Sequence, residues 1–349
     1  MASVHLKNIR KSFSSQNVID KLNLDVAEGE FVSILGPSGC GKTTCLRLIA
    51  GLELPTGGDV WFGSSSVVPI PPENRDVGMV FQHYALFPHM TVEKNIVFGL
   101  NIRNEPKELI QQKFNDIINV VQLGDEIHKY PSELSGGQMQ RVALARTLIT
   151  HPRVLLMDEP FANLDANLRN DMRDFVRSLQ QKLQITTILV THDQQEAMEL
   201  SDRVAVMFNG KIAQYDTPEN LFYKPDSALV AEFLGAVNLL QGRLISGVEF
   251  ESEVGNLTLE SHGDSDYTLA SVRPERVKLI EIEDYTYREN SFSGIIDQVK
   301  FNGTFNEITL SIGTKTIICI EISGKVRTPG KPIYIQFPSA DLWLLRGTR

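Results

Sequence analysis

Short continuous runs of apolar residues recur through the first two-thirds of the chain, and each is as long as a buried strand. These runs occupy residues 31–35, 77–81, 154–157 and 185–190. Between the last two, residues 168–183 place apolar side chains every three or four positions, which is the period of a helix with one buried face. Buried strands that alternate with such helices predict a mainly parallel sheet with helices packed on it.

Turn residues and changes of period divide the rest of this first part. Residues 1–30 have a partly alternating apolar pattern, which predicts strands joined by turns. A helix is predicted to start at Lys42 and to end at Gly51, and prolines and glycines at 55–58 predict a loop. Residues 91–150 are predicted to be mainly helical, which makes them a helical insertion in an α/β fold.

The pattern changes again near residue 236. Beyond it, short β-rich runs are separated by Gly and Asn-Gly turns, with no helical period. These runs are 239–245, 307–312, 316–320 and 333–337. We therefore expect an α/β domain over 1–235, with a helical subdomain at about 84–150, and a small all-β, barrel-like domain over 236–349.

Length and charge limit the possible partners. With 349 residues the chain has room for two or three domains. A formal net charge of −9 argues against nucleic acid or anionic lipid as the main partner, because both attract basic surfaces. No apolar run is long enough to cross a bilayer, and no secretory signal follows Met1. We expect any membrane role to be peripheral and to depend on another protein.

The cysteines and histidines do not predict a metal site. Cys40, Cys45 and Cys319 match neither a disulfide framework nor a zinc spacing, which fits a reducing cytosol. His83 and His89 have no further ligand at a usual spacing, so we interpret them as surface or interface residues.

The clearest chemical signal is the glycine-rich segment at 36–43, which has the sequence GPSGCGKT between an apolar strand and a helix. Glycines let backbone N–H groups approach phosphate oxygens, and the helix N-terminus adds a favourable dipole. Lys42 is expected to pair with the β- and γ-phosphates, and Thr43 to place its hydroxyl on Mg²⁺. This phosphate loop therefore predicts a nucleotide site.

Two carboxylates end the strand at 154–157. Asp158 suits the Mg²⁺ shell, and Glu159 suits a general base that polarises the attacking water. Taken alone, these residues are equally consistent with a buried strand that ends in an acidic turn. Because ligands bind at the carboxyl edge of open α/β sheets, we expect Gly36, Asp158 and His192 to meet at one edge.

A second glycine-rich segment, LSGGQ at 134–138, opens another helical run. Free N–H groups at such a helix start can hold an anion. The alternative is that Ser135 is a plain N-cap beside a flexible turn. Two glycine-rich helix starts in one chain predict a nucleotide site built from two copies of the fold.

The order of these segments resembles that of the ABC transporter ATPases, over roughly residues 3–235. The matching elements are the phosphate loop, Gln82, residues 134–138, Asp158-Glu159, Leu164-Asp165, and His192 followed by Asp193-Gln194-Gln195-Glu196-Ala197. The resemblance implies the P-loop NTPase fold with ATP and Mg²⁺ as cofactors. It also implies a head-to-tail homodimer, in which each ATP lies between the phosphate loop of one copy and residues 135–137 of the other.

The resemblance further implies a role for each matching residue. The catalytic residues would be the base Glu159, the γ-phosphate switch His192, and Gln82. The nucleotide-binding residues would be Phe13, Gly36, Pro37, Ser38, Gly39, Cys40, Gly41, Lys42, Thr43 and Thr44. The residues that reach across the dimer would be Ser135, Gly136, Gly137, Gln138 and Asp165. The Mg²⁺ ligands would be Thr43, Gln82 and Asp158.

Two aromatic features have structural alternatives. Phe13 matches the aromatic residue that stacks on adenine, but a core phenylalanine would give the same pattern. The stretch 84–90 corresponds to the segment that faces the permease, so we expect Tyr84, Leu86 and Phe87 to contribute there, with core packing explaining part of it.

The tail carries Val272-Arg273-Pro274-Glu275, which resembles a motif of the accessory OB-like (TOBE) domain in ATPases of sugar, polyamine, sulfate and ferric-iron importers. A strand that ends at a proline is the alternative. The resemblance implies an import ATPase, peripheral at the cytoplasmic face of the inner (plasma) membrane. Its partners would be a permease and, indirectly, a solute-binding protein, with no nucleic acid.

The solute is the least determined part. Residues 163–174 are similar to ferric-iron importers, whereas 236–242 are similar to sulfate and polyamine types. We rank ferric iron slightly first. The alternative function is a soluble ABC ATPase of DNA repair or translation, although such proteins usually have two cassettes or a long coiled coil and a basic surface. A purely regulatory protein would keep the fold but need no intact Glu159.

Overall fold

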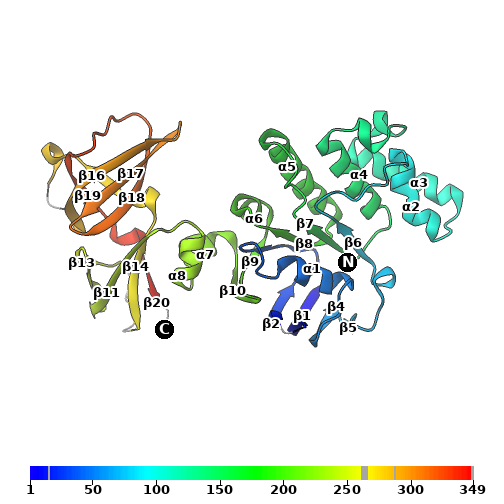
Figure 1. The fold of residues 1–349 in the computed structure, drawn as a ribbon, viewed down its shortest axis with the longest axis horizontal. Helices are drawn as coiled ribbons and strands as arrows, with labels where there is room; N and C mark the ends of the chain where they lie inside the picture. The colour runs from blue at the N-terminus through cyan, green and yellow to red at the C-terminus, as the bar shows by residue number, and fades with distance from the viewer. Residues whose placement is uncertain (15, 261–265, 287, 347–349) are drawn as a thin grey trace. The chain divides into compact units, whose positions relative to one another are not determined.

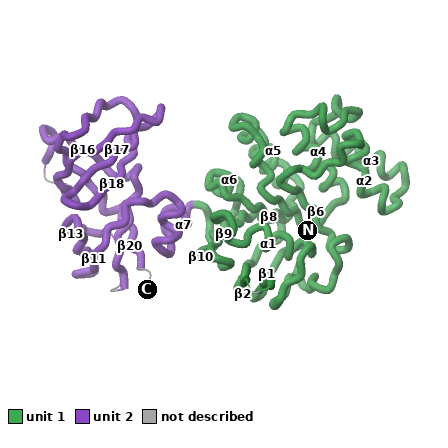
Figure 2. The backbone as a smooth tube through the Cα atoms, viewed as in Figure 1, with its two compact units in different colours: residues 1–218 green, residues 219–349 purple. Residues whose placement is uncertain are grey.

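Strands and helices alternate through the first part of the chain, as its apolar pattern predicts. The computed structural model describes residues 1–14, 16–260, 266–286 and 288–346. The chain divides into two units, residues 1–218 and 219–349, which Figure 2 colours separately. The domain boundary near residue 236 stays a prediction, since division by compactness leaves α8 (Ala228–Phe233) with the second unit.

A six-stranded sheet forms the centre of the first unit. Its order is β10-β9-β3-β8-β7-β6, in which β10 is antiparallel to β9 and the other neighbours are parallel. The strands are β3 (Phe31–Leu35), β6 (Val77–Val80), β7 (Val154–Asp158), β8 (Thr186–Thr191), β9 (Arg203–Phe208) and β10 (Lys211–Asp216). Every residue of β3 and β8 is buried. A parallel sheet is covered on both faces, which explains why these strands are continuous rather than alternating apolar runs.

Helices pack on this sheet and form the insertion. They are α1 (Lys42–Ala50), α2 (Val92–Ile102), α3 (Lys107–Val121), α4 (Gly136–Leu148), α5 (Ala166–Leu183) and α6 (Gln194–Leu200). The predicted end of α1 is confirmed, because Gly51 has a φ of 81° and closes the helix with a left-handed cap. Figure 1 shows α2, α3 and α4 gathered at one end of this unit, which confirms the predicted helical region. None of the described helices is long and apolar enough to span a membrane.

A four-stranded antiparallel sheet, of order β2-β1-β4-β5, completes the first unit. Its strands are β1 (Val4–Phe13), β2 (Gln16–Val26), β4 (Gly57–Phe62) and β5 (Ser65–Ser66). The predicted loop at 55–58 was wrong for its second half, because Gly57 and Gly58 begin β4. A Cβ atom on Gly58 would lie 2.4 Å from the Asn8 carbonyl oxygen, so glycine is needed for this close pairing with β1 rather than for a loop.

The second unit is β-rich, as the tail pattern predicts. One sheet has the order β13-β12-β11-β14-β20 and the other β15-β19-β16-β17-β18. The elements are α7 (Pro218–Tyr223), α8, β11 (Asn238–Ser246), β12 (Glu249–Ser252), β13 (Gly255–Thr258), β14 (Tyr267–Val272), β15 (Lys278–Ile280), β16 (Ser291–Phe301), β17 (Phe305–Ile312), β18 (Lys315–Ile322), β19 (Pro332–Gln336) and β20 (Leu342–Arg346). Both sheets contribute to one core, for example through Leu240, Phe250, Ile308 and Ile335.

Candidate nucleotide site

Four neighbouring parallel strands bring distant segments to one edge of the central sheet. In the order β3, β8, β7 and β6, their carboxyl ends lead into Gly36, His192, Glu159 and Gln82. The predicted meeting of Gly36, Asp158 and His192 at one edge is therefore confirmed by the strand order. The phosphate loop, Gln82, Asp158, Glu159 and His192 come together at this edge, which makes it the candidate site for phosphate chemistry.

The phosphate loop is held in place by close backbone contacts. A Cβ atom on Gly36 would lie 2.2 Å from the Met207 carbonyl oxygen, and Gly41 has a φ of 109°. Glycine at these two positions is therefore required by packing and by conformation. The Lys42 ammonium is buried and donates to the carbonyl oxygens of Gly36 and Pro37, at 2.7 and 3.0 Å. These contacts place the amine inside the curve of the loop.

A hollow of about 220 Å³ opens beside the loop. Its lining residues are Val18, Ser38, Gly39, Gly41, Lys42, Thr43, Thr44 and Glu159. Most of these were predicted to bind nucleotide, and the hollow brings them together with the carboxylate that was predicted to be the base. Val18 was not predicted, because it lies in β2 and belongs to no motif.

Thr43 and Asp158 are joined across the edge. The Thr43 hydroxyl donates to Asp158 Oδ1 at 3.0 Å. Burial raises the pKa of the Asp158 carboxyl, the hydrogen bond from Thr43 lowers it, and the neighbouring charge of Glu159 raises it again. The charges of Arg47 and Lys42 lower it, but the net direction of the pKa is upward, so burial makes this carboxylate harder to ionise than one in water.

Glu159 is bracketed by the two other predicted catalytic side chains. Gln82 Nε2 donates to Glu159 Oε2 at 3.2 Å, and His192 Nδ1 lies 3.1 Å from Oε1. Glu159 itself has a φ of 44°, in the left-handed region that residues with a Cβ rarely adopt. Such backbone strain is typical of functional positions. The strained turn points the carboxylate along the sheet edge and toward the hollow beside the phosphate loop.

The LSGGQ segment forms a capped helix start. Ser135 Oγ accepts from the Gln138 N–H at 3.3 Å, and Gln138 Oε1 accepts from the Ser135 N–H at 2.9 Å, which is a capping box. The plain N-cap reading of Ser135 is thus correct as a local description. Within the described residues, no hydrogen bond joins this segment to the phosphate loop of the same chain.

The same helix start packs on the segment after Glu159. A Cβ atom on Gly137 would lie 2.8 Å from Leu168 Cδ1, and one on Gly136 would lie 3.1 Å from Leu164 Cδ2. Between those leucines, the exposed Asp165 caps α5 by accepting from the Leu168 N–H at 3.0 Å. Glycines at 136 and 137 therefore allow two helix N-termini to approach closely.

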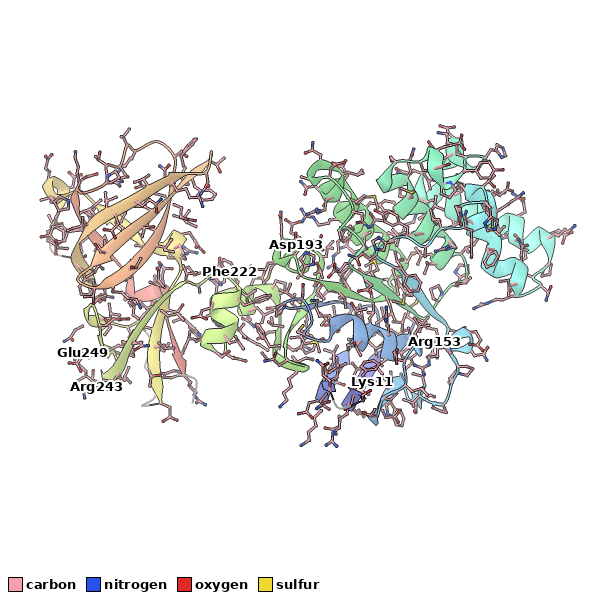
Figure 3. The ribbon with its side chains drawn as sticks, in the orientation of Figure 1. Lys11, Arg153, Asp193, Phe222, Arg243 and Glu249 are labelled. Atoms are coloured by element: carbon pink, nitrogen blue, oxygen red, sulfur yellow. The ribbon has the colours of Figure 1, made fainter. Side chains whose placement is uncertain are left out.

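Further hydrogen bonds and an ion pair join these segments to one another. Asn163 Nδ2 donates to the Gln82 carbonyl oxygen at 2.8 Å, and Arg169 lies 3.7 Å from Asp193 while donating to the Leu164 carbonyl oxygen at 3.1 Å. Asp193 is labelled in Figure 3. These residues lie in or beside the matched segments, but the sequence does not predict their contacts, because each contact depends on which strands are neighbours in the sheet.

The predicted aromatic residues lie in two environments. Phe13 is 43% exposed at the end of β1, so the alternative of a core phenylalanine does not describe it. Tyr84 is buried, whereas Leu86 and Phe87 are half-buried, and Arg146 donates to the carbonyl oxygens of Tyr84 and Ala85. The segment after Gln82 is thus partly core and partly surface, as the sequence predicts.

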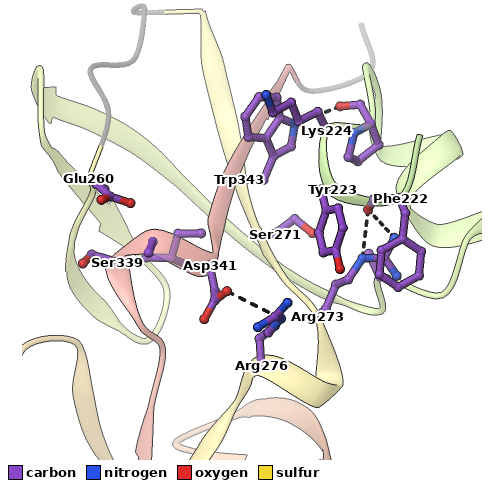
Figure 4. A pocket seen from close by; sticks show the side chains of 14 residues that line it. Phe222, Tyr223, Lys224, Glu260, Ser271, Arg273, Arg276, Ser339, Asp341 and Trp343 are labelled. Carbon is purple, nitrogen blue, oxygen red and sulfur yellow. Dashed lines mark hydrogen bonds and ion pairs between the residues drawn. The ribbon is translucent and has the colours of Figure 1, made fainter. Parts of the chain in front are cut away.

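In the second unit, the arginine of the VRPE motif is buried and hydrogen-bonded to backbone carbonyl groups (Figure 4). Arg273 donates to the carbonyl oxygens of Phe222 and Leu234, and its guanidinium lies 3.3 Å from the centre of the Phe222 ring. It borders a pocket of about 420 Å³ in which Trp343 Nε1 also donates to the Pro225 carbonyl oxygen, at 3.0 Å. These contacts fasten α7 and α8 to the sheets of this unit.

The sheet edge, the phosphate loop and the paired glycine-rich helix start define a nucleoside triphosphate-binding α/β protein with an added β domain. Comparisons agree with this class. Residues 19–162 match the family described as ABC transporter, and residues 270–345 match the TOBE domain. The solved structure of cbiO1 from Clostridium perfringens, part of the ABC transporter complex cbiONQ, aligns with a TM-score of 0.59 at 26% identity, covering 63% of this chain and 90% of that one.

Proteins similar over 80% or more of the chain include import ATP-binding proteins of three kinds. The Fe(3+) ions import ATP-binding protein FbpC of Photorhabdus laumondii is 49% identical over 349 residues, 98% of this chain and 97% of that protein. The spermidine/putrescine protein PotA of Lawsonia intracellularis is 39% identical over 93% of this chain and 88% of its own length. The sulfate/thiosulfate protein CysA 2 of Shewanella oneidensis is 43% identical over 80% of each.

The chain therefore belongs to the ABC transporter family, as an ATP-hydrolysing, importer-type ATP-binding subunit with a TOBE domain. The predicted fold class and the predicted family are both confirmed.

Proposed function

We propose that this chain energises the uptake of a small solute by binding and hydrolysing ATP between two copies of itself. The observation that carries the proposal is the arrangement around Glu159. Its carboxylate lies between Gln82 and His192, at 3.2 and 3.1 Å, and lines the hollow beside Lys42. Such a group is positioned to take a proton from a water that attacks the γ-phosphorus.

The hydrolysis step follows from these positions. A water oxygen forms a bond to the γ-phosphorus, the bond from phosphorus to the β,γ-bridging oxygen breaks, and ADP leaves with that oxygen. Glu159 accepts the proton of the water. Gln82 orients the carboxylate through its hydrogen bond, His192 holds it until ATP binds, and Lys42 stabilises the charge on the β- and γ-phosphate oxygens. His192 is exposed, so it can turn toward the γ-phosphate when ATP binds.

The residues around Thr43 fit Mg²⁺. Thr43, Gln82 and Asp158 offer a hydroxyl, an amide and a carboxylate, and oxygen donors of this kind are the ones that Mg²⁺ prefers. The Thr43 hydroxyl and Asp158 already meet at 3.0 Å, and the raised pKa of Asp158 means that a cation would relieve the cost of its charge. When bound there, Mg²⁺ would supply charge neutralisation for the phosphates.

The second copy is needed because the LSGGQ segment makes its hydrogen bonds away from the phosphate loop of its own chain. At the start of α4, Ser135 is exposed and Gly136 is half-buried, and the positive dipole end of the helix suits a phosphate. The packing of Gly136 and Gly137 on Leu164 and Leu168 ties this start to Asp165. A second copy, docked head to tail, would present all of these residues to the first copy's γ-phosphate.

The remaining partners follow from the relatives and from the segment after Gln82. We propose that Leu86 and Phe87 contact a membrane permease, with the buried Tyr84 supporting this segment from the core, so that the subunit is peripheral at the cytoplasmic face of the inner membrane. A solute-binding protein would act on the permease's other side. The backbone of this segment is linked to the catalytic residues through Gln82 and Asn163, which couples ATP binding to the permease.

Ferric iron is the proposed solute. The FbpC proteins of Photorhabdus laumondii and Vibrio cholerae are 49% and 42% identical over 98% of this chain, whereas the polyamine and sulfate relatives are 39–43% identical over less of it. Uptake assays in a deletion strain, complemented with the parent chain or with Glu159→Gln, test this. Loss of iron uptake that only the parent restores supports the proposal. Normal iron uptake in the deletion strain, with lost uptake of a polyamine or of sulfate, would replace iron by that solute.

A further inference from the structure

A buried lysine lies against the exposed ring of Phe13. The Lys11 ammonium is 4.6 Å from the centre of that ring, although Lys11 is only 8% exposed and Phe13 is 43% exposed. Figure 3 labels Lys11 on the N-terminal strands. A buried ammonium loses hydration, so its position must be fixed by acceptors and by the ring.

Those acceptors lie just beyond the phosphate-loop helix. Lys11 Nζ donates to Glu53 Oε2 and to the Leu54 carbonyl oxygen, both at 2.9 Å. Glu53 is itself fixed to the last turn of α1, because its N–H donates to the Arg47 carbonyl oxygen at 3.2 Å. The lysine thus links the Phe13 ring to the far end of the helix whose first turn carries Lys42 and Thr43.

The hairpin that carries Phe13 also borders the phosphate hollow. Phe13 pairs with Gln16 where β1 turns into β2, and Val18 of β2 lines the hollow. A Cβ atom on Gly41 would lie 3.0 Å from the Val18 carbonyl oxygen, so β2 is in contact with the phosphate loop itself. A nucleotide whose phosphates occupy the loop would therefore have its base near this hairpin.

We propose that Lys11 is a positioning residue for the adenine platform, and that it tunes base stacking on Phe13 from the side opposite the base. The proposal rests on the proposed function, in which Phe13 stacks on adenine. The face of an aromatic ring is negative, and so is the π-face of a purine. An ammonium against one face offsets that charge and fixes the ring plane, which favours stacking of a base on the other face.

The same strand offers a matched control. The Lys7 ammonium lies 4.5 Å from the centre of the Trp61 ring, in a second contact of the same kind. Lys7 is exposed, and Trp61 lies in β4, away from the phosphate hollow. Lys7→Met removes one charge and one lysine–ring contact from β1, as Lys11→Met does, without touching the platform.

The test compares binding of ATP with binding of inorganic tripolyphosphate, by calorimetry on the full chain with Mg²⁺. Tripolyphosphate keeps the phosphate contacts and lacks the base. We expect Lys11→Met to weaken ATP binding about fivefold, to leave tripolyphosphate binding within about twofold, and to have no further effect on ATP in a Phe13→Ala background. Lys7→Met is expected to leave both affinities unchanged.

Three results would overturn the proposal: unchanged ATP affinity in Lys11→Met, equal weakening of ATP and tripolyphosphate, or an undiminished effect in the Phe13→Ala background. If Lys11→Met does not fold, the ATP affinities of two other variants, Lys11→Arg and Glu53→Gln, test the proposal instead. Lys11→Arg keeps a cation on the ring and should stay within about twofold of the parent for ATP, whereas Glu53→Gln loosens the anchor and should weaken ATP alone. If Lys11→Arg weakens ATP binding more than Glu53→Gln does, the proposal is contradicted. Failure of Phe13→Ala to weaken ATP would instead overturn the adenine role of Phe13.

Discussion

The nucleotide edge of the first unit and the Arg273 cluster of the second both carry sequence motifs, yet their polar groups are satisfied in opposite ways. At the nucleotide edge, the carboxylates bond to other side chains, as Asp158 does with Thr43 and as Glu159 does with Gln82 and His192; the Lys42 ammonium is the exception, since it donates to backbone carbonyl oxygens. In the second unit, Arg273 bonds to backbone carbonyl oxygens and is 8% exposed.

This difference separates a reactive site from a structural one. A pair of side chains at a partly open edge can exchange its partner for a phosphate, a metal ion or a water at little cost. A guanidinium that satisfies buried carbonyl groups cannot leave them without exposing those groups to an apolar interior. Motif residues of the first kind are expected to control turnover, and those of the second kind to control stability.

The largest expected effect belongs to Glu159. Glu159→Gln keeps the shape of the side chain but cannot accept the proton of the water, so we expect steady-state ATP turnover to fall about 100-fold or more while ATP still binds. The control Glu73→Gln changes an exposed carboxylate in a short turn and should leave turnover unchanged. Turnover near the parent level in Glu159→Gln would assign the base to another residue. The nucleotide edge could then not be contrasted with the Arg273 cluster as the reactive site.

Arg273→Ala tests whether the Arg273 cluster stabilises the second unit. The substitution leaves the carbonyl oxygens of Phe222 and Leu234 without their donor and removes the contact with the Phe222 ring, so we expect unfolding of the second unit to become easier by about 2–3 kcal/mol. ATP affinity should not change. Arg276→Ala is the matched control, since Arg276 is half exposed and lies 3.6 Å from Asp341. If the two variants have the same free energy of unfolding, the contacts of Arg273 do not stabilise the second unit as proposed.

Asp158 should show the smallest effect, and one of the opposite sign. Because burial raises its pKa in the folded chain above the unfolded value, its charge disfavours folding at neutral pH, and this penalty disappears as the pH falls through those pKa values. Asp158→Asn should therefore raise the Tm of the nucleotide-free protein at pH 7 by about 2 °C, with the difference shrinking in acid. Thermal unfolding at both pH values checks this. A lower Tm at neutral pH would show that the charge contributes to folding, and would remove the contrast between reactive and structural residues.

The sequence predicted the parts of this molecule that short segments determine. Buried strands such as β3 and β8 are continuous apolar runs, the phosphate loop has its conformation set by glycines such as Gly41, and the LSGGQ helix start is capped by its own Ser135 and Gln138. The contacts of Val18, Asn163 and Lys11 could not be predicted in this way. Each joins residues that are distant in the chain and share no motif, and each depends on which strands become neighbours. The lysine under Phe13, for example, meets Glu53 only because the end of α1 lies against β1.

The wrong loop at 55–58 has a similar cause. Glycines predict turns when only the local sequence is considered, whereas Gly58 serves a close approach to Asn8 in β1. Gly58 also has a φ of 84°, which favours glycine in a strand as it does in a turn, so the local sequence alone does not distinguish the two.

The sharing of ATP between two copies is tested most directly by determining the structure of the Glu159→Gln chain with Mg²⁺ and ATP. We predict a head-to-tail pair in which each γ-phosphate lies against Lys42 of one copy and within hydrogen-bond distance of Ser135 from the other. A γ-phosphate enclosed by Lys42 and Ser135 of the same copy, or with no second copy against it, would contradict the shared site.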